Sequence, residues 1–162
     1  MTMTFSTADL CDEFSGEIQV IGSEFKSYGK KTSFSGPICT VKVFEDNILI
    51  NQALEDIPVG SVLVVDGGGS KKCALLGDRL AGIAENRNLA GIIINGCVRD
   101  SKELADINIG ILALGSNPLK SKKDGTGEVN IPLFFLGTDW HPGDYLYADS
   151  DGIVISKRKL VD

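Results

Sequence analysis

The sequence predicts a mixed α/β fold built as a single domain over residues 1–162, with a C-terminal third that is mostly β. Short apolar runs alternate with amphipathic helical segments in the middle of the chain, and apolar runs separated by tight turns follow one another after residue 127. The 162 residues, 43% hydrophobic and 23% charged, suit one globular core. A chain of this length buries roughly 70% of its unfolded surface on folding, so we expect no second domain.

The N-terminal third contains two predicted helices and one predicted strand. Ser6 or Thr7 can cap a short helix whose first turn is acidic. The stretch "GPICTVKVFED" alternates apolar and polar residues, which is typical of a half-buried strand. The stretch "NILINQALED" then predicts a helix that ends before Pro58, because proline interrupts a helix.

Strands and helices alternate in the middle of the chain. The stretch "GSVLVVDGGG" predicts a buried strand that runs into three glycines, and "CALLG" predicts a short strand after it. Next, "DRLAGIAENRN" places its apolar residues on one helical face and Asp78 in the first turn, so we expect a helix whose free N–H groups point toward the sheet edge. The glycine-bounded run "AGIIING" predicts another buried strand.

Strands dominate the rest of the chain. A polar turn or helix across residues 99–106 leads to the predicted strand "NIGILALG", and residues 116–127 predict a flexible loop. The strands predicted after this loop are "VNIPLFFLG", "DYLYAD" and "GIVISK". In the turn "DSDG", Gly152 can adopt positive φ, and a hairpin is favoured over a calcium loop because the other acidic ligands of such a loop are missing.

Charge and hydropathy exclude two classes of partner. A formal net charge of -6 and a pI near 4.8 argue against direct nucleic-acid binding, which needs clustered Lys and Arg. The small basic stretches "LKSKKDG" and "SKRKL" are interpreted as a solvated loop and a solvated tail. No apolar run approaches the roughly 18 residues that cross a bilayer, and the first residues do not resemble a secretory signal. We therefore expect a cytoplasmic protein without membrane association.

Cysteine, histidine and glycine give no strong motif. The cysteines have no CxxC spacing and are expected to be free buried thiols rather than zinc ligands; they are Cys11, Cys39, Cys73 and Cys97. His141 is the only histidine, and the surrounding "DWHPGD" favours a surface role over catalysis. The glycines of "VLVVDGGGSKK" lack the spacing of a Walker loop or a dinucleotide fingerprint, so they are interpreted as a turn that lets the next strand pack closely.

One group of charged residues follows two of the predicted strands. Asp78 begins a helix, and after twenty further residues Arg99 and Asp100 leave a buried strand, with Glu103 three positions beyond. If the strands are neighbours, these side chains meet at one sheet edge. Two carboxylates one helical turn apart suit Mg²⁺, and an adjacent arginine can bind a carboxylate or a developing oxyanion. The structural alternative is an Arg99–Glu103 ion pair with Asp100 as a helix cap.

Six stretches together resemble the family of the regulator of ribonuclease activity A and 4-hydroxy-4-methyl-2-oxoglutarate aldolase, and the resemblance covers nearly the whole chain. They are "DLCDEF", "FSGPICTVKVFEDN", "VLVVDGGGSKKCALLGD", "GIIINGCVRD", "DINIGILALGSNP" and "GDYLYADSDGIVIS". The diagnostic part is the arrangement of Asp78, Arg99, Asp100 and Glu103. This resemblance implies a β/β/α sandwich of the swivelling-domain type, assembled as a ring-shaped homotrimer with sites near the subunit interfaces.

The resemblance also implies a divalent-metal-dependent, class II aldolase. Such an enzyme cleaves 4-hydroxy-4-methyl-2-oxoglutarate into two pyruvates and decarboxylates oxaloacetate, because both reactions pass through a pyruvate enolate. Asp100 would hold the metal, Mg²⁺ or alternatively Mn²⁺, either by itself or with Glu103 acting through water. Arg99 would bind the substrate and stabilise the enolate oxygen.

The same resemblance implies that a helix N-terminus receives the substrate carboxylate. The residues whose backbone N–H groups would do so are Gly77, Asp78, Arg79 and Leu80, and the Asp78 side chain would orient Arg99 or a water. No residue identifies the general base. A Schiff-base mechanism through a lysine is disfavoured, because no candidate lysine lies in a desolvated context that would lower its pKa. The candidate lysines are Lys71, Lys72 and Lys102.

A second implied function is non-catalytic. Members of the family bind and inhibit ribonuclease E, and the acidic charge of this chain would suit an arginine-rich partner. A protein that only binds a partner has no need of Asp100 after Arg99, whereas metal chemistry has. The sequence therefore favours the enzyme over the regulator.

Overall fold

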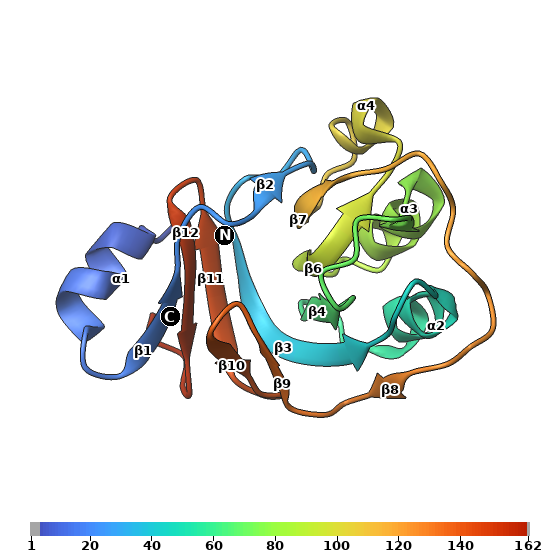
Figure 1. Cartoon of the computed structure of the whole chain (residues 1–162). Helices are drawn as coiled ribbons and strands as arrows, with labels where there is room; N and C mark the ends of the chain where they lie inside the picture. The colour runs from blue at the N-terminus through green and yellow to red at the C-terminus, as the bar shows by residue number, and fades with distance from the viewer. Residues whose placement is uncertain (1–3, 162) are drawn as a thin grey trace.

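The computed structural model describes residues 4–161 of the chain (Figure 1). Within them, ten strands form one mixed sheet in the order β1-β12-β11-β3-β4-β6-β7-β2, with β5 beside β6 and β8 beside β3, while β9 and β10 form a separate hairpin. The strands are β1 (Ile18–Ile21), β2 (Lys26–Ser27), β3 (Phe34–Lys42), β4 (Val62–Asp66), β5 (Ala74–Leu76), β6 (Gly91–Val98), β7 (Gly110–Ser116), β8 (Glu128–Val129), β9 (Leu133–Phe135), β10 (Thr138–Trp140), β11 (Tyr145–Asp149) and β12 (Gly152–Ser156). The helices are α1 (Thr7–Phe14), α2 (Ile48–Asp56), α3 (Asp78–Asn86) and α4 (Ser101–Leu104). Within residues 4–161, none of these helices has the length and hydropathy of a membrane span.

Strand β3 joins two halves of the sheet that differ in strand direction. Its residues 34–37 pair antiparallel with β11, and its residues 38–42 pair parallel with β4. Beyond β11, the antiparallel half continues through β12 to β1. Beyond β4, the parallel half continues through β6 to β7. Figure 1 shows β3 curving from one half into the other, so the expected mixed α/β fold is present, with only part of its sheet parallel.

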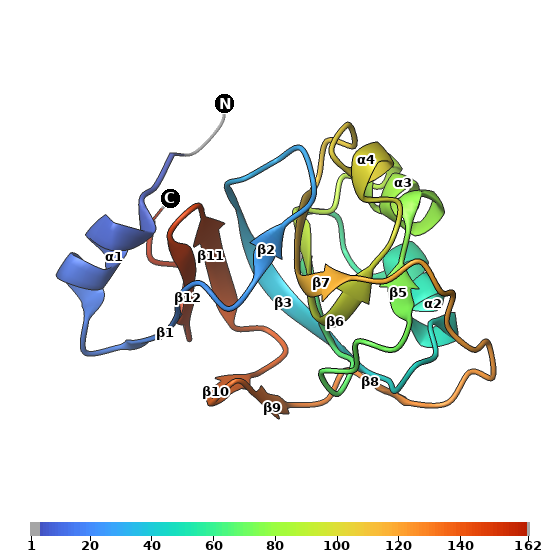
Figure 2. The same cartoon turned by 45° about the horizontal axis from the view of Figure 1, so that its top comes forward.

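Side chains that alternate along β4 fill two different cores. Leu63 and Val65 pack with residues of α2 and α3, whereas Val62 and Val64 pack with Leu146 and other residues of the antiparallel half. A third cluster lies under α1, on the other face of β11 and β12. The layers therefore follow one another as α2 and α3, the parallel half, the antiparallel half and α1 (Figures 1 and 2). Each buried aliphatic side chain of this kind stabilises the fold by roughly 1.5–3 kcal/mol.

The aromatic ring of Phe34 lies between the two halves and depends on two glycines. A Cβ atom added at Gly91, the first residue of β6, or at Gly110, the first residue of β7, would overlap this ring. These two positions lie opposite each other in the register of β6 and β7. Glycine at both strand starts therefore allows β3 to pack its ring directly on the backbone of the parallel half.

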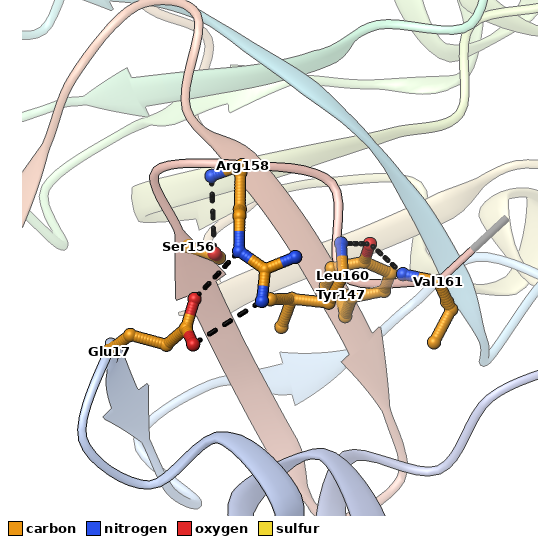
Figure 3. A network of polar contacts seen from close by, with 6 residues as sticks. All are labelled: Glu17, Tyr147, Ser156, Arg158, Leu160 and Val161. Carbon is orange, nitrogen blue, oxygen red and sulfur yellow. Dashed lines mark hydrogen bonds and ion pairs between the residues drawn. The ribbon is translucent and has the colours of Figure 1, made fainter.

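Polar contacts of the C-terminal residues close the antiparallel half, as Figure 3 shows. The hydroxyl of Tyr147 accepts a hydrogen bond from the backbone N–H of Leu160 at 2.8 Å. Arg158 donates to both carboxylate oxygens of Glu17, from Nε at 2.9 Å and from Nη2 at 3.3 Å. Its guanidinium also lies 5.4 Å from the ring centroid of Phe14, the last residue of α1. The C-terminal segment is thus fastened to α1 and to the turn that leads into β1.

Most of the predicted elements are confirmed. Ser6 is the N-cap of α1, and its hydroxyl accepts a hydrogen bond from the N–H of Asp9 at 3.3 Å. Gly152 has a φ of 153°, in the region that favours glycine. The four cysteines are free as expected, although Cys11 and Cys39 are only half-buried.

Two predicted strand boundaries are wrong. Strand β6 continues beyond Gly96, where the predicted strand ends, to Val98, and Arg99 follows it directly, as expected. The stretch "VNIPLFFLG" is not one strand, because Asn130 has a φ of 58° and interrupts the extended backbone after Val129. Pairing resumes at Leu133, in β9. Periodicity alone did not reveal this interruption, since asparagine tolerates the left-handed region without an accompanying glycine.

Candidate functional site

A polar cavity of about 210 Å³ opens where β5 and β6 end and α3 begins. Leu76 and Val98 are paired at the ends of the two strands. The residues that follow them, 77–80 and 99–100, therefore leave the sheet side by side and line the cavity. Part of its remaining lining comes from Lys120, Ser121 and Lys123 of the loop after β7. Figure 2 shows this loop passing α2 on its way to β8.

The carboxylate of Asp100 joins two of these segments. Asp100 has a φ of 59° and stands at the N-cap position of α4, but its side chain makes no capping hydrogen bond to that helix. Its Oδ2 instead accepts a hydrogen bond from the backbone N–H of Asp78 at 3.0 Å, at the first residue of α3. A left-handed conformation in a residue other than glycine costs roughly 1–3 kcal/mol. The cap expected of Asp100 therefore exists, but on a different helix from the expected one.

Gly77 provides the space for this contact. A Cβ atom at position 77 would lie 2.6 Å from Oδ2 of Asp100 and 3.4 Å from Cγ of Arg99. Gly77 is also the N-cap residue of α3 and has no side chain to cap it. Asp100 supplies the missing acceptor from the neighbouring segment, so these two residues act together at the start of α3.

The residues at the start of α3 line the cavity. The lining includes all four residues expected there, Gly77, Asp78, Arg79 and Leu80. The first N–H groups of a helix have no acceptor within it, and the positive end of the helix dipole lies at the same place. Because Asp100 takes the N–H of Asp78, the N–H groups of Arg79 and Leu80 are the ones left to receive an anion.

Arg99 lies in the cavity lining, whereas Glu103 does not. Glu103 is exposed on α4. Among the described residues, the ion pairs are Lys157–Asp144 and Arg158–Glu17, so the Arg99–Glu103 pair of the structural alternative is not formed. The half-buried guanidinium of Arg99 thus borders the cavity without a carboxylate partner from residues 4–161.

Sequence reasoning missed the contribution of the basic loop. The stretch "LKSKKDG" was expected to be a solvated loop, yet Lys120, Ser121 and Lys123 line the same cavity as Arg99. The signal was available in the strand order: β7 is the neighbour of β6 in the parallel half, so the loop after β7 leaves the sheet at the same edge. Lys120 and Lys123 are solvent-exposed and also face the site.

The cavity has the opposite charge from the whole protein. Its lining contains four cationic side chains and two carboxylates, whereas the chain carries a formal net charge of -6. The cations are Arg79, Arg99, Lys120 and Lys123, and the carboxylates are Asp78 and Asp100. A concave site with excess positive charge attracts small anions and raises their local concentration. Together with the helix N-terminus, this charge indicates a site for an anionic ligand.

Comparisons with known proteins identify the family of this chain. A sequence profile of the RraA-like family, described as Aldolase/RraA, matches residues 7–155. The chain belongs to the RraA-like family. A relative from Bacillus cereus, named "Putative 4-hydroxy-4-methyl-2-oxoglutarate aldolase", is 58% identical over 156 residues, which are 96% of this chain and 98% of the relative.

Two solved structures have nearly the same fold as this RraA-like protein. The RNA-processing inhibitor RraA from Thermus thermophilis has a TM-score of 0.94 at 43% identity, covering 98% of this chain and 96% of that one. A protein from Geobacillus kaustophilus, titled S-adenosylmethionine: 2-dimethylmenaquinone methyltransferase, has a TM-score of 0.95 at 56% identity, covering 96% of this chain and 97% of that one. Three similar proteins thus carry three different functional names.

The residues of this RraA-like site fit a hard divalent cation better than zinc. Within residues 4–161, no three His, Cys, Asp or Glu side chains converge as a ready-made metal site, and His141 lies in the turn between β10 and β11, outside the cavity lining. Mg²⁺ commonly takes only one or two protein carboxylates and keeps its other positions for water and substrate. Asp100 and Asp78 each place a carboxylate in the cavity lining, a number of protein carboxylates that is common at Mg²⁺ sites.

Proposed function

We propose that this RraA-like protein is a divalent-metal-dependent aldolase that cleaves 4-hydroxy-4-methyl-2-oxoglutarate into two pyruvates. Decarboxylation of oxaloacetate is its second reaction, because both substrates release a pyruvate enolate. The observation that carries this proposal is the positively charged cavity in which Arg99, Asp100 and the start of α3 meet. The name of the Bacillus cereus relative supports it. The swivelling-domain β/β/α fold type and the ring-shaped homotrimer implied by the resemblance belong to the same proposal.

The charged residues that follow β6 and begin α3 have separate roles in this proposal. Asp100 holds the cation, Mg²⁺ or Mn²⁺, and Glu103 acts on it only through water, since Glu103 is outside the cavity lining. When bound, the cation polarises the 2-oxo group of the substrate. Arg99 binds the substrate and stabilises the negative charge that develops on the enolate oxygen. Asp78 orients Arg99 or a water molecule.

The substrate carboxylate next to the 2-oxo group binds at the start of α3. The N–H groups of Arg79 and Leu80 donate to it, since that of Asp78 is already held by Asp100. Its negative charge is further stabilised by the positive end of the α3 dipole. Strand β5 positions these N–H groups, because α3 follows it directly with only Gly77 between them.

The size and lining of the cavity favour a small 2-oxo acid over a nucleoside cofactor. A volume of about 210 Å³ is below the roughly 300–1,000 Å³ of sites that enclose drug-sized ligands. Of the described residues that line the cavity, none is aromatic, so an adenine ring would find no stacking surface. For this reason we favour the aldolase over the methyltransferase activity that the Geobacillus kaustophilus title states.

The test is metal-dependent release of pyruvate from both substrates. Protein treated with EDTA is assayed before and after addition of Mg²⁺ or Mn²⁺, beside the variants Asp100→Ala and Asp12→Asn. Asp12 is an exposed acid on α1 and serves as the matched control, because α1 contributes nothing to the cavity. We expect metal-restored activity in the wild type and in Asp12→Asn but not in Asp100→Ala. Turnover by Asp100→Ala that still responds to Mg²⁺ would place the cation elsewhere.

A second candidate function is regulation of ribonuclease E by direct binding. The Thermus thermophilis structure is titled an RNA-processing inhibitor, and the net charge of -6 suits a basic partner segment. A pull-down with the basic segment of the ribonuclease tests it. Tight binding that is unchanged in Asp100→Ala, together with no pyruvate release by the wild type, would favour the regulator and overturn the aldolase. Light scattering of the same samples tests the homotrimer.

A further inference from the structure

The basic loop after β7 is fixed in place rather than flexible, contrary to the sequence expectation. Its Leu119 carbonyl accepts a hydrogen bond from the N–H of Ala74 at 2.7 Å, at the start of β5. Further along, the N–H of Lys122 donates to the carbonyl of Glu45 at 2.8 Å, and the carbonyl of Lys122 accepts from the N–H of Asn47 at 3.3 Å. These backbone contacts hold residues 119–122 against β5 and the start of α2.

A buried carboxylate fastens the rest of the loop. Asp46 is only 2% exposed, and its Oδ2 accepts hydrogen bonds from the N–H groups of Asp124 at 2.8 Å and Gly125 at 3.0 Å, with that of Thr126 at 3.5 Å. Its Oδ1 accepts another from the N–H of Ile48 at 3.1 Å. Burial acts to raise the pKa of Asp46, but these backbone N–H groups together lower it below its ordinary value. The ionised carboxylate is therefore the form that holds the loop.

The fixed loop presents two of its lysines to the site. Lys120 and Lys123 line the cavity, whereas Lys122 lines a separate hollow beside Phe44. Lys123 Nζ donates to Oδ1 of Asn47 at 3.1 Å, and this amide in turn donates from Nδ2 to the carbonyl of Leu75 at 3.3 Å. A neutral amide leaves the charge of Lys123 uncompensated, so the lysine keeps its attraction for an anion in the cavity.

We propose that Lys120 and Lys123 form a subsite for the second carboxylate of the substrate, the one remote from the 2-oxo group, and that Asp46 is the positioning residue of this subsite. This inference rests on the proposed function. It makes the enzyme selective for dicarboxylates: one carboxylate binds at the start of α3, and the other binds the two lysines. Pyruvate, which has a single carboxylate, uses only the first of these contacts.

The two proposed reactions depend on this subsite in different ways. In aldol cleavage the bond between C3 and C4 breaks, the hydroxyl proton is lost, and the remote carboxylate stays charged on the departing pyruvate. Its contact with the lysines is therefore equally strong in the ground state and the transition state, and lowers KM. In oxaloacetate decarboxylation the remote carboxylate itself leaves as carbon dioxide and loses its charge. The lysines then stabilise the ground state more than the transition state, which lowers kcat.

Removing the lysine charges separates these two effects. The variants are Lys120→Met, Lys123→Met and the double variant, with Lys122→Met as the matched control from the same loop. For 4-hydroxy-4-methyl-2-oxoglutarate we expect KM to rise roughly tenfold per lysine, the scale of one charge-assisted hydrogen bond, with kcat little changed. For oxaloacetate we expect KM and kcat to rise together, so that kcat/KM changes less. Lys122→Met should match the wild type.

A third reaction separates failure of this inference from failure of the proposed function. Exchange of the pyruvate methyl protons with deuterated water, followed by NMR, reports enolate formation without a second carboxylate. A wild type that exchanges pyruvate and cleaves both substrates, beside a double variant with unaltered KM for the dicarboxylate, would overturn the subsite but leave the aldolase standing. A wild type that performs none of the three reactions with metal present would overturn the proposed function itself.

The positioning role of Asp46 has its own test. Asp46→Ala should raise KM for the dicarboxylate as the lysine variants do, and Asp46→Asn, which keeps one oxygen acceptor, should restore part of the affinity. Asp149→Ala is the control, because Asp149 also anchors backbone N–H groups but lies outside the cavity lining. If both alanine variants lose thermal stability but neither changes KM, Asp46 is structural only and the positioning role is refuted.

Discussion

Arg99 in the parallel half of the sheet and Arg158 in the antiparallel half differ in what surrounds them. Arg158 donates twice to Glu17 and lies over the ring of Phe14. Its hydrogen bonds to Glu17 raise the pKa of Arg158 above the ordinary value of an arginine. Arg99 borders a cavity and has no ion-pair partner among residues 4–161. An arginine that is hydrogen-bonded to a carboxylate joins two segments of the fold. An arginine that has no carboxylate partner and borders a cavity is available to bind a ligand.

The same contrast holds for two carboxylates with lowered pKa. Asp149 accepts from Thr7 twice, from Oγ1 at 2.6 Å and from the backbone N–H at 2.8 Å, and thereby ties α1 to the turn between β11 and β12. Burial acts to raise the pKa of Asp149, and these hydrogen bonds lower it overall. Asp46 uses the same chemistry to hold the loop that lines the cavity. The same type of contact, a carboxylate accepting backbone N–H groups, thus stabilises the antiparallel half and positions the loop at the cavity of the parallel half.

The largest effect is expected from Arg99→Ala. Loss of one donor directed at a developing oxyanion costs roughly 3 kcal/mol of transition-state stabilisation, so kcat/KM should fall by about two orders of magnitude. Folding stability should change little, since the side chain has no ion pair to lose within the described chain. Steady-state kinetics and urea unfolding measure the two quantities. A rate within a few-fold of the wild type would remove Arg99 from the reaction.

Asp46→Ala should cause the next largest effect. Its removal deprives four backbone N–H groups of the buried carboxylate that accepts their hydrogen bonds, which costs roughly 3 kcal/mol in the free energy of unfolding. Urea unfolding measures this loss, and Asp46→Asn should recover part of it. An unchanged unfolding midpoint in the alanine variant would mean that water replaces the carboxylate.

The lowered pKa values predict a loss of stability in acid. A carboxyl group with a depressed folded-state pKa contributes stability that is complete above its unfolded pKa of about 3.9 and disappears as the pH falls through the folded value. Wild-type protein should therefore lose stability below about pH 4. In Asp46→Asn and Asp149→Asn the decline should be shallower, because the titrating group is gone. Unfolding curves at several pH values, from about 3 to about 7, test the sign.

Arg158→Met should have the smallest effect. Its ion pair with Glu17 is exposed to solvent, and exposed pairs contribute little to stability. We expect a small decrease in Tm and no change in pyruvate release, in contrast to Arg99→Ala. If Arg158→Met lost activity without losing stability, the distinction between Arg158 as a structural residue and Arg99 as a site residue would be wrong.

The sequence was most informative where local chemistry decides the structure. Periodicity placed β4, β6 and α3, and the rule that parallel strands end at one edge brought Asp78 and Arg99 together. The capping partner of Asp100 could not be predicted, because its left-handed backbone redirects the side chain from α4 to α3. The anchoring of the basic loop could not be predicted either, since Asp46 and Asp124 are far apart in the chain and meet only through the tertiary fold.

The pairing of β1 with β12 has a consequence for synthesis of the protein on the ribosome. Ile21 of β1 pairs with Ile153, which is synthesised much later. The first residues of β3 likewise cannot pair until β11 has been synthesised. The parallel strands, by contrast, are complete once β7 has emerged. During translation the half that carries the cavity can therefore reach its native pairing while β1 still presents unpaired edges, which are surfaces that chaperones recognise and that nascent chains must keep from aggregating.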